Sequence, residues 1–368
     1  KKSNNFFFKI KITEAQILLN QNIIKDKYYN LKIREEKISI ETKDKFKKLI
    51  SNIIIKNMPN EYLESYLSLN DYFINRLPKK IPIDILIRSQ VESNTNLRYL
   101  ISLLHERGSR IISCQEGGDV GIKALSLYPE KIFSSLCDLW LTWGWGKESD
   151  KKILKFYFTK NFWIKDYKYK KNGNLLMIGG SCKNYFMSFL EGQLPIHNNQ
   201  HLKYNQTFIS NLNSNTFKKL LYRFHWRFGF NEDKKLLKKF PKLNCSFRED
   251  TSHFYTLLNN SKLAIITSEF TTYKQTFLVN HPTILLWDKD YFAVRDNAKK
   301  IFDELYEAKI FHYDPKECAK FVNNIQNNTM DWWKSDKVQL ARKNFLLNFN
   351  KLSDNIENEF VKIIKKNN

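Results

Sequence analysis

The order of apolar and polar positions along this chain predicts strands and helices that alternate. The run IPIDILIRS at 81–89 is rich in Ile and Leu and predicts a buried strand, and residues 95–109 carry apolar side chains at helical spacing. A second strand is expected at 110–115, and a glycine turn follows it directly. A strand, a helix, a strand and a glycine turn in this order predict a βαβ unit with a right-handed crossover.

The same alternation continues in the second half of the chain. The run NLLMIGG at 174–180 predicts a strand that ends in paired glycines. Further strands are expected at 139–143, 243–247, 262–268 and 282–287. Helices are expected at 45–75, with a break at Pro59, and at 205–222, 233–240, 253–261, 271–280 and over most of 297–366. Alternation in both halves favours an α/β fold with two Rossmann-like domains, each built on a parallel sheet.

Changes in this pattern predict the domain boundaries. Residues 1–44 contain only short β-leaning pieces, Asn5–Ile12 and Lys37–Thr42, and are expected to be the remnant of a preceding N-terminal region of a longer protein. The first Rossmann-like domain is expected at 45–170 and the second at 171–350, joined through a charged and aromatic stretch at 147–171. Residues 351–368 are expected to form a C-terminal helix or tail.

Composition narrows the class of protein. With 42% hydrophobic and 15% aromatic residues, the 368-residue chain is not disordered, collagenous or of low complexity. No stretch approaches the roughly 18 consecutive apolar residues of a membrane-spanning helix. The five cysteines show no CxxC spacing, which argues against a zinc knuckle or a disulfide framework and favours a reducing cytoplasm.

The formal net charge of +23 raises the question of nucleic-acid binding. Only 11 of the 61 basic residues are Arg, Asn reaches 39, and the basic residues are spread along the chain. This pattern is typical of an AT-rich genome. It favours attraction to an anionic membrane surface or to phosphorylated substrates over specific nucleic-acid binding.

A glycine-rich segment after the strand at 110–115 is the first candidate site. Ligands of open α/β sheets bind at the carboxyl ends of the strands. The glycines in this turn, beginning with Gly117 and Gly118, would let the backbone approach a ligand. Glu116 would hold a carboxylate there as a general base, with Asp119 in the same turn. A glycine turn that carries a solvated acid is the alternative.

The second candidate site follows the strand at 262–268. Ser268, Thr271 and Thr272 place hydroxyls at the start of a helix, where a phosphate can bind. Gln275, one helical turn further on, could reach a ribose. An ordinary Ser/Thr helix cap is the alternative.

Two arginines lie between these segments in the sequence. Arg223 and Arg227 are four residues apart, which on a helix places both guanidinium groups on one face, where they could bind a diphosphate. A solvated surface pair is the alternative. Asp288-Lys289-Asp290 matches a metal-binding DxD motif but is expected to be a turn, so no metal site is predicted. Trp332-Trp333 is expected to pack in the interior.

Several stretches resemble a transferase family encoded in bacterial O-antigen and lipopolysaccharide clusters. The resemblance covers about residues 55–350 and is most specific where TWGW, PTILLW and DWW…VQxAR occur in combination. The stretches are CQEGGDVGIKA at 114–124, DLWLTWGW at 138–145, LLYRFHWRFGF at 220–230, TTYKQTFLVNHPTILLWD at 271–288 and FVNNIQNNTMDWWKSDKVQLARKNF at 321–345.

The resemblance implies a GT-B-like fold, with two Rossmann-like domains facing across a cleft. The acceptor would bind to residues 45–170, including Asp138 of the family's D-x-Y-x-TWGW pattern, and the nucleotide sugar to residues 171–350. Glu116 stands where the family has His, and Gln275 where it has Glu. His281-Pro282 is similar to the His-Pro pair of transferases that use CMP-sugars, which adds His281 to the donor site.

Together these patterns predict a glycosyltransferase that moves a sugar from a nucleotide sugar to a surface-polysaccharide acceptor. The nucleotide sugar would be a co-substrate, and no cofactor or metal is expected. The enzyme would be cytoplasmic, with peripheral contact to the anionic cytoplasmic face of the inner membrane. The alternative is a non-catalytic, Lys-rich protein that binds nucleic acid or an anionic membrane surface.

Overall fold

The computed structural model describes residues 30–35, 41–77, 84–87, 95–147, 149–159, 166–180, 183–185, 194–225, 229–247 and 253–366. The chain forms two compact units, Lys1–Ile111 and Ile112–Asn368. The expected domain boundaries at 44, 170 and 350 differ from this division and stay a prediction. The β-leaning piece at 5–12 lies outside the described residues.

The first unit is mainly helical around a small core. Its elements are α3 (Leu31–Glu35), α4 (Lys45–Ile53), a 3₁₀ turn at Asn60–Tyr62, α5 (Tyr66–Ile74), β1 (Asp84–Ile87) and α6 (Thr95–Glu106). The core joins α5 and α6, where Phe73 stacks on Tyr99 with 5.7 Å between ring centroids. Buried Arg34 of α3 forms an ion pair with Glu64 at 2.6 Å, which lowers the pKa of Glu64 to about 2. Residues just before position 44 therefore pack with those that follow it.

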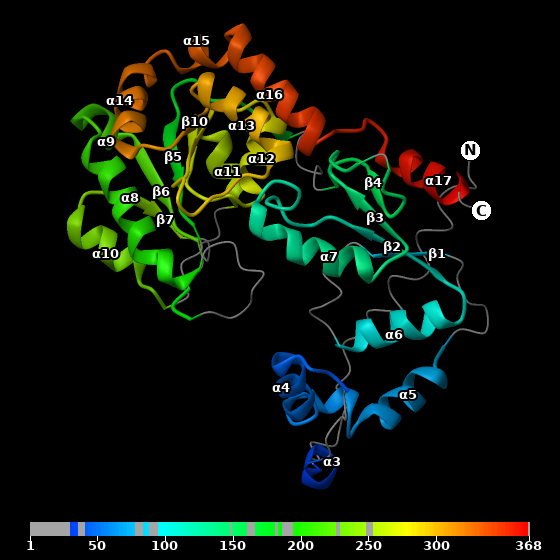
Figure 1. Ribbon diagram of the computed structural model, residues 1–368. Coiled ribbons are helices and arrows are strands. Elements are labelled where there is room, and N and C mark those ends of the chain that lie inside the picture. Colours follow the sequence, from blue (N-terminus) through cyan, green and yellow to red (C-terminus); the bar gives the residue numbers. More distant parts are fainter. Residues whose placement is uncertain are drawn as a thin grey trace. The chain divides into compact units, whose positions relative to one another are not determined.

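The second unit contains most of two parallel sheets (Figure 1). The first sheet has the order β1-β2-β3-β4, with β2 at Arg110–Cys114, β3 at Leu139–Thr142 and β4 at Ile153–Lys155, and the division between the units falls within β2. The second sheet has the order β10-β9-β8-β5-β6-β7. Its strands are β5 (Asn174–Ile178), β6 (Leu220–Arg223), β7 (Asn244–Ser246), β8 (Ser261–Ile266), β9 (Thr283–Leu286) and β10 (Phe311–His312).

Helices cover both faces of the second sheet (Figure 1). The helices of this unit are α7 (Leu127–Ser135), α8 (Asn198–Ser210), α9 (Ser214–Lys218), α10 (Glu232–Lys239), α11 (Phe254–Asn259), α12 (Thr272–Leu278), α13 (Asp296–Glu307), α14 (Pro315–Ile325), α15 (Thr329–Trp333), α16 (Asp336–Phe349) and α17 (Ile356–Lys366). All six residues of β8 are buried, as expected for a central parallel strand with helices on both sides. None of the described helices is long and apolar enough to cross a membrane.

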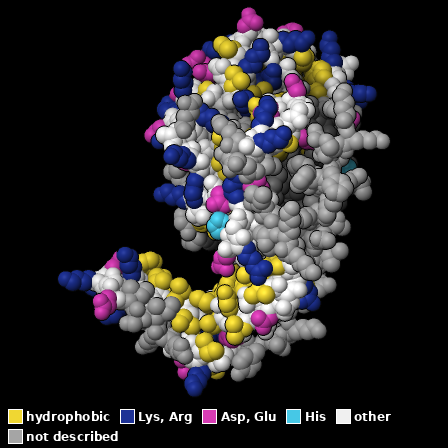
Figure 2. Space-filling model, turned by 90° about the vertical axis from the view of Figure 1, so that its right-hand side faces the viewer, with side chains coloured by type: hydrophobic (Ala, Val, Ile, Leu, Met, Phe, Trp, Pro, Cys, Tyr) yellow, Lys and Arg dark blue, Asp and Glu magenta, His cyan; other side chains and the backbone are white. Residues whose placement is uncertain are grey.

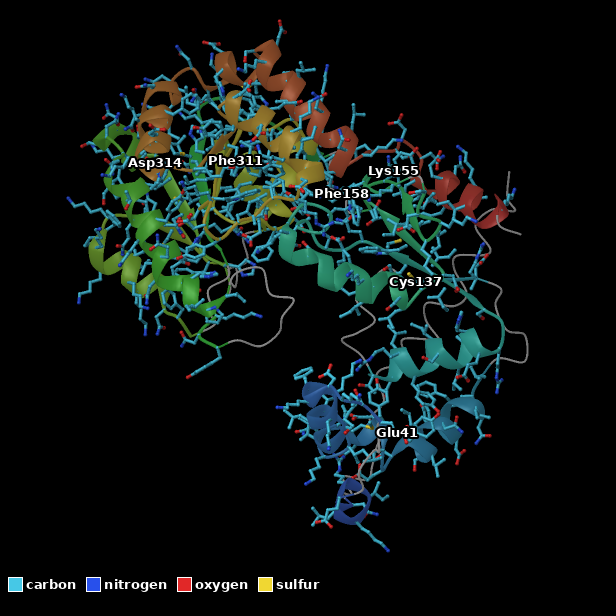
Figure 3. The ribbon with its side chains drawn as sticks, in the orientation of Figure 1. Glu41, Cys137, Lys155, Phe158, Phe311 and Asp314 are labelled. Atoms are coloured by element: carbon cyan, nitrogen blue, oxygen red, sulfur yellow. The ribbon has the colours of Figure 1, made fainter. Side chains whose placement is uncertain are left out.

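Alternate residues of the strands supply two separate layers of core. Leu175, Met177, Leu263 and Ile265 lie in one apolar cluster with side chains of α8, α10 and α14. On α12, α13 and α16, an aromatic group surrounds Phe345, whose ring centroid lies 5.3–6.0 Å from those of three other aromatic residues. These are Tyr273, Phe277 and Phe302, and Phe302 also contacts Phe311 of β10. Figure 3 labels Phe311.

Helix α17 packs back onto the first sheet. Ile363 is buried in one cluster with Ile112, Leu141 and Phe156, and the ring of Phe360 lies 4.5 Å from that of Phe156. Figure 1 shows α17, in red, beside β3 and β4. Helix α17 therefore belongs to the core of the first sheet, and the predicted boundary at 350 stays a prediction.

The prediction of an α/β fold with two parallel sheets is confirmed, and so are the predicted strands at 110–115, 139–143, 174–180, 243–247, 262–268 and 282–287. The predicted helix at 205–222 is correct for the end of α8 and for the short α9, which Asn213 caps, but it is wrong at its end, where Leu220–Arg223 form β6. Leu220 and Tyr222 are buried and alternate with half-buried neighbours, a period of two that fits between β5 and β7. Strands β4 and β10 were not predicted from the sequence; both are very short.

We expect Phe345→Ala to lower the free energy of unfolding by about 3–5 kcal/mol, because it removes a fully buried ring from the aromatic group. Leu347→Ala on the same helix is the control: this side chain is 64% exposed, and a change within about 0.5 kcal/mol is expected. Urea denaturation of both variants measures the difference. Equal effects would show that α16 does not pack as described.

Candidate functional site

The second sheet reverses its strand order between β5 and β8. Numbered within this sheet alone, its strands follow the order 3-2-1-4-5-6 of doubly wound nucleotide-binding folds, and neighbours across the reversal are β5 and β8. The register pairs Ile178 with Ile266 at the carboxyl end, and Thr267 N donates to Ile178 O at 3.1 Å. Loops that leave such a point in opposite directions open a crevice where ligands bind.

Three polypeptide segments meet at this reversal. Gly179 and Gly180 follow β5, buried Ser268 follows β8, and Arg223 ends β6. Gly179 N donates to Arg223 O at 3.0 Å, so the ends of β5 and β6 adjoin. A Cβ on Gly179 would lie 2.6 Å from the Tyr222 hydroxyl, so this glycine is also required for packing.

Buried Gln115 organises the glycine loop that follows β2. Its Oε1 accepts from Trp143 N at 3.0 Å and from the indole N–H of Trp145 at 2.7 Å. Its Nε2 donates to Gly117 O at 2.7 Å and Val120 O at 3.2 Å. One amide thereby satisfies four polar groups and fixes the loop between the ends of β2 and β3.

Gly118 brings this loop into direct contact with the segment before α12. A Cβ on Gly118 would lie 2.6 Å from the Cα of Thr271, a distance that no side chain can occupy. The hydroxyl of buried Tyr273 donates to Gly118 O at 3.3 Å. The two candidate segments predicted from the sequence therefore contact each other, and Gly118 packs against backbone rather than against a ligand.

A second set of contacts fixes the same loop at Gly121. Gly121 has a φ of +84°, and a Cβ there would lie 2.4 Å from the Trp145 ring. Gly121 N donates to Glu130 Oε1 at 2.7 Å, and the same carboxylate forms an ion pair with Arg295. Arg295 N also donates to Ile122 O at 2.9 Å. The glycine loop is thus held to the segment between β9 and α13.

Charged side chains are buried beside this contact. Lys123 Nζ pairs with Glu269 Oε1 at 2.5 Å, and both side chains are largely buried. Burial, followed by the nearby charge of Glu269, raises the pKa of Asp119. Burial lowers the pKa of Lys274 to about 7, although its ammonium group donates to Phe349 O at 2.9 Å.

Two histidines from the start of α8 lie near the same charges. His197 stacks on Tyr291 with 3.9 Å between centroids, and His201 lies one turn further along. Burial lowers the pKa of His201 to about 4 and also lowers that of His197, while the charges of Glu269 and Asp288 act in the opposite direction on both. At neutral pH these imidazoles are uncharged hydrogen-bonding groups.

Several residues predicted from the sequence lie at this site. Glu116 is partly buried in the glycine loop, directly after Gln115. Thr272 begins α12, and Gln275 on that helix donates to the Tyr255 hydroxyl at 3.3 Å. Asp288 accepts from Asp290 N at 3.0 Å, so the DxD match is a turn. The described residues contain no group of three His, Cys, Asp or Glu that could hold a metal.

Other predicted residues are not brought together with them. His281 precedes β9 and Asp138 precedes β3, so each lies at the amino end of its strand, opposite the loops above. His281 is fully buried between Tyr167 and Ser261, and burial lowers its pKa to about 3, so we assign it a structural role. Arg223 ends a strand, so the helical pairing with Arg227 is wrong, and Arg227 lies outside the described residues.

Several polar and charged groups that hold these segments in place were not predicted from the sequence. They are Gln115, Lys123, Glu130, Glu269 and Arg295, and nearby Lys274, His197 and His201 were not predicted either. The i, i+4 spacing of His197 and His201 was a visible signal, and so was a lysine inside the apolar part of α12. The ion pairs had no local signal, because Lys123 and Glu269 are far apart in the sequence.

This chain matches the model of one protein family. The model of the LIC12162 family of transferases matches residues 1–364. Among curated proteins, no sequence matches this chain.

Several solved structures are similar in fold. Anabaena Alr3699/HepE in complex with UDP and glucose is 12% identical, with 84% of each chain covered and a TM-score of 0.49. The S. aureus TarM G117R mutant in complex with fondaparinux, alpha-GlcNAc-glycerol and UDP is 10% identical, with 81% of this chain and 58% of that chain covered and a TM-score of 0.49. Spinosyn rhamnosyltransferase SpnG with thymidine diphosphate is 11% identical over 84% and 79%, with a TM-score of 0.41. At this level the likeness concerns the fold alone.

The buried lysine gives a pH prediction. The folded protein releases the Lys274 proton near pH 7, whereas the unfolded chain holds it to about pH 10.5. The unfolded state therefore binds more protons in between, and stability rises with pH by up to about 1.4 kcal/mol per unit. We expect the parent to gain stability relative to Lys274→Met between about pH 7.5 and 9.

Urea denaturation at several pH values measures this difference. Lys343→Met, at an exposed position of α16, is the control and should show no such trend. A difference between the parent and Lys274→Met that stays constant with pH would contradict a lowered pKa of Lys274.

Proposed function

This chain belongs to the LIC12162 family of transferases, and we propose that it is a GT-B-like glycosyltransferase that moves a sugar from a nucleotide-sugar donor to a glycan acceptor. The observation that carries the proposal is the reversal of strand order between β5 and β8, with Gly179, Arg223 and Ser268 at its carboxyl edge. A small residue lets a ligand approach the backbone, and a guanidinium group can bind a diphosphate.

The donor binds at this edge in our proposal. Arg223 neutralises the diphosphate, with Ser268 and Thr272 as hydroxyl donors and Gln275 on the ribose side of α12. Arg227 remains a proposed second cation for the diphosphate. The role of Thr271 is reduced relative to the sequence prediction, because Gly118 packs on its backbone.

Glu116 acts on the acceptor in our proposal. Its position after a buried amide that fixes the glycine loop gives the carboxylate a defined location, which a general base requires. The reaction uses no metal ion, since the positive charge of Arg223 and main-chain N–H groups can stabilise the leaving nucleotide diphosphate.

The acceptor in this proposal is a lipid-linked precursor of a surface polysaccharide of the O-antigen or lipopolysaccharide type. The sequence resemblance over residues 55–350 supports it. The enzyme would work in the cytoplasm, in peripheral contact with the anionic face of the inner membrane. The large excess of Lys over acidic residues favours such contact.

We expect Arg223→Ala to weaken nucleotide binding about 10–150-fold, because a charged hydrogen bond to phosphate contributes roughly 1.5–3 kcal/mol. Titration of UDP, thymidine diphosphate and CMP, followed by calorimetry, measures the effect. Arg107→Ala, at an exposed position after α6, is the control and should bind nucleotide like the parent. Unchanged affinity in Arg223→Ala would place the donor elsewhere.

Glu116→Gln should fold normally and lower turnover by roughly 10²–10⁴-fold, the usual contribution of a positioned acid or base. Nucleotide affinity should stay the same, because Glu116 is assigned to the acceptor. The control is Glu106→Gln at the exposed end of α6. Near-parental turnover in Glu116→Gln would reduce this residue to part of a turn.

A further inference from the structure

Helix α4 of the first unit turns its apolar side to solvent. Phe46 is 68% exposed, Leu49 is 54% exposed, and Ile50, Ile53 and Ile54 are also exposed. At 100° per residue these five side chains lie along one face of the helix. Buried Ser51 lies on the other side, and its hydroxyl donates to Lys48 O at 2.8 Å. A helix that served only the core of its own unit would be oriented the opposite way.

Lysines border the apolar face. Lys45 flanks it on one side and Lys47 on the other, and both are exposed. Exposed Lys56 follows in the turn after the helix. Lys48, on the polar side, is also exposed.

The acidic groups of this segment, Glu41 (Figure 3) and Asp44, both precede the helix. The Asp44 carboxylate caps the helix by accepting from Phe46 N at 2.8 Å and Lys47 N at 3.2 Å. Segment 41–57 therefore carries a net positive charge around a row of exposed apolar side chains. Figure 2 shows hydrophobic side chains gathered on the surface of the first unit, which contains α4, α5 and α6.

We propose that α4 docks on an anionic lipid surface, with Phe46, Leu49 and Ile53 in the acyl region and the flanking lysines at the headgroups. Apolar side chains on one face and lysines at its borders are what an interfacial helix needs, since burial of apolar area and attraction to anionic lipid add together. The lysines indicate which partner binds this face, because an anionic membrane complements both the row of apolar side chains and their positive charge. With nine residues, α4 lies on the surface and does not span it.

This inference extends the proposed function, because it names the segment that would bring the enzyme to a lipid-linked acceptor. It can nevertheless be tested separately. Vesicle binding needs no sugar transfer, and nucleotide binding needs no vesicles. Failure of one leaves the result of the other unaffected.

The test is flotation of the full chain with vesicles of phosphatidylcholine alone or of phosphatidylcholine mixed with phosphatidylglycerol. We expect the parent to bind the mixed vesicles and to lose binding as salt is raised. Phe46→Ser with Leu49→Ser should bind at least about tenfold more weakly. Each of Lys45→Gln and Lys47→Gln should cost about fivefold.

Matched variants separate docking from loss of folding. Leu347→Ser, at a similarly exposed apolar position of α16, should bind vesicles like the parent. Phe46→Trp should bind at least as tightly as the parent, because indole rings favour the membrane interface. All α4 variants should bind UDP, thymidine diphosphate and CMP as the parent does.

Three results would overturn the inference. The first is a parent that fails to float with mixed vesicles at low salt. The second is equal loss of flotation in Leu347→Ser and the α4 variant. The third is a concentration-dependent dimer, measured by sedimentation without vesicles, that Phe46→Ser dissociates, since this would show that the apolar face covers a second copy of the chain.

Discussion

The backbone of the glycine loop after β2 lies directly on the backbone before α12, and the candidate site depends on this contact. At Gly118 there is no room for a Cβ against Thr271, so any other residue there would push the two segments apart. The Lys123–Glu269 ion pair also joins the loop to the segment before α12. The Glu130–Arg295 ion pair and main-chain hydrogen bonds from Ala124 N to Ala293 O and from Arg295 N to Ile122 O hold the same loop to the segment between β9 and α13. The carboxyl ends of the two sheets are thereby held together within one unit.

This arrangement buries several ionisable groups partly or fully. Asp119, Lys123, Glu269 and Lys274 lie close enough to influence one another, and burial shifts the pKa of Asp119 upward and that of Lys274 downward. The Lys123–Glu269 ion pair offsets part of the cost of removing these two charges from solvent. Groups with shifted pKa values at the carboxyl ends of parallel strands are typical of functional sites, where low polarity strengthens interactions with a charged ligand.

The strands and helices that could be predicted from the sequence are those with a clear local pattern of apolar residues. Buried parallel strands such as β8 and β9 are continuous apolar runs, and the helices between them have apolar residues at helical spacing. Strand β6 was missed because Leu220–Arg223 follow a helical stretch, and only pairing with β5 and β7 decides their conformation.

The loops that form the candidate site could be predicted from the sequence. Glu116 and Ser268 follow predicted strands, and the fold places them at the expected ends. Resemblance to a His-Pro pair and to the D-x-Y-x-TWGW pattern added His281 and Asp138 to the predicted site, but each precedes its strand and lies at the end opposite the loops. The pairing of Lys123 with Glu269 depends on how distant segments meet, which a single sequence does not encode in any local signal.

The return of α17 to the first sheet also bears on how the protein is made. Phe156 and Ile112 need Phe360 and Ile363 to complete their cluster, so this core stays open on the ribosome until the far end of α17 has emerged. Until then, aromatic surface of the nascent chain is exposed for the whole time that the second sheet takes to be synthesised. Exposed apolar surface promotes aggregation, so we expect a chain that ends before α17 to aggregate rather than to form a shorter enzyme.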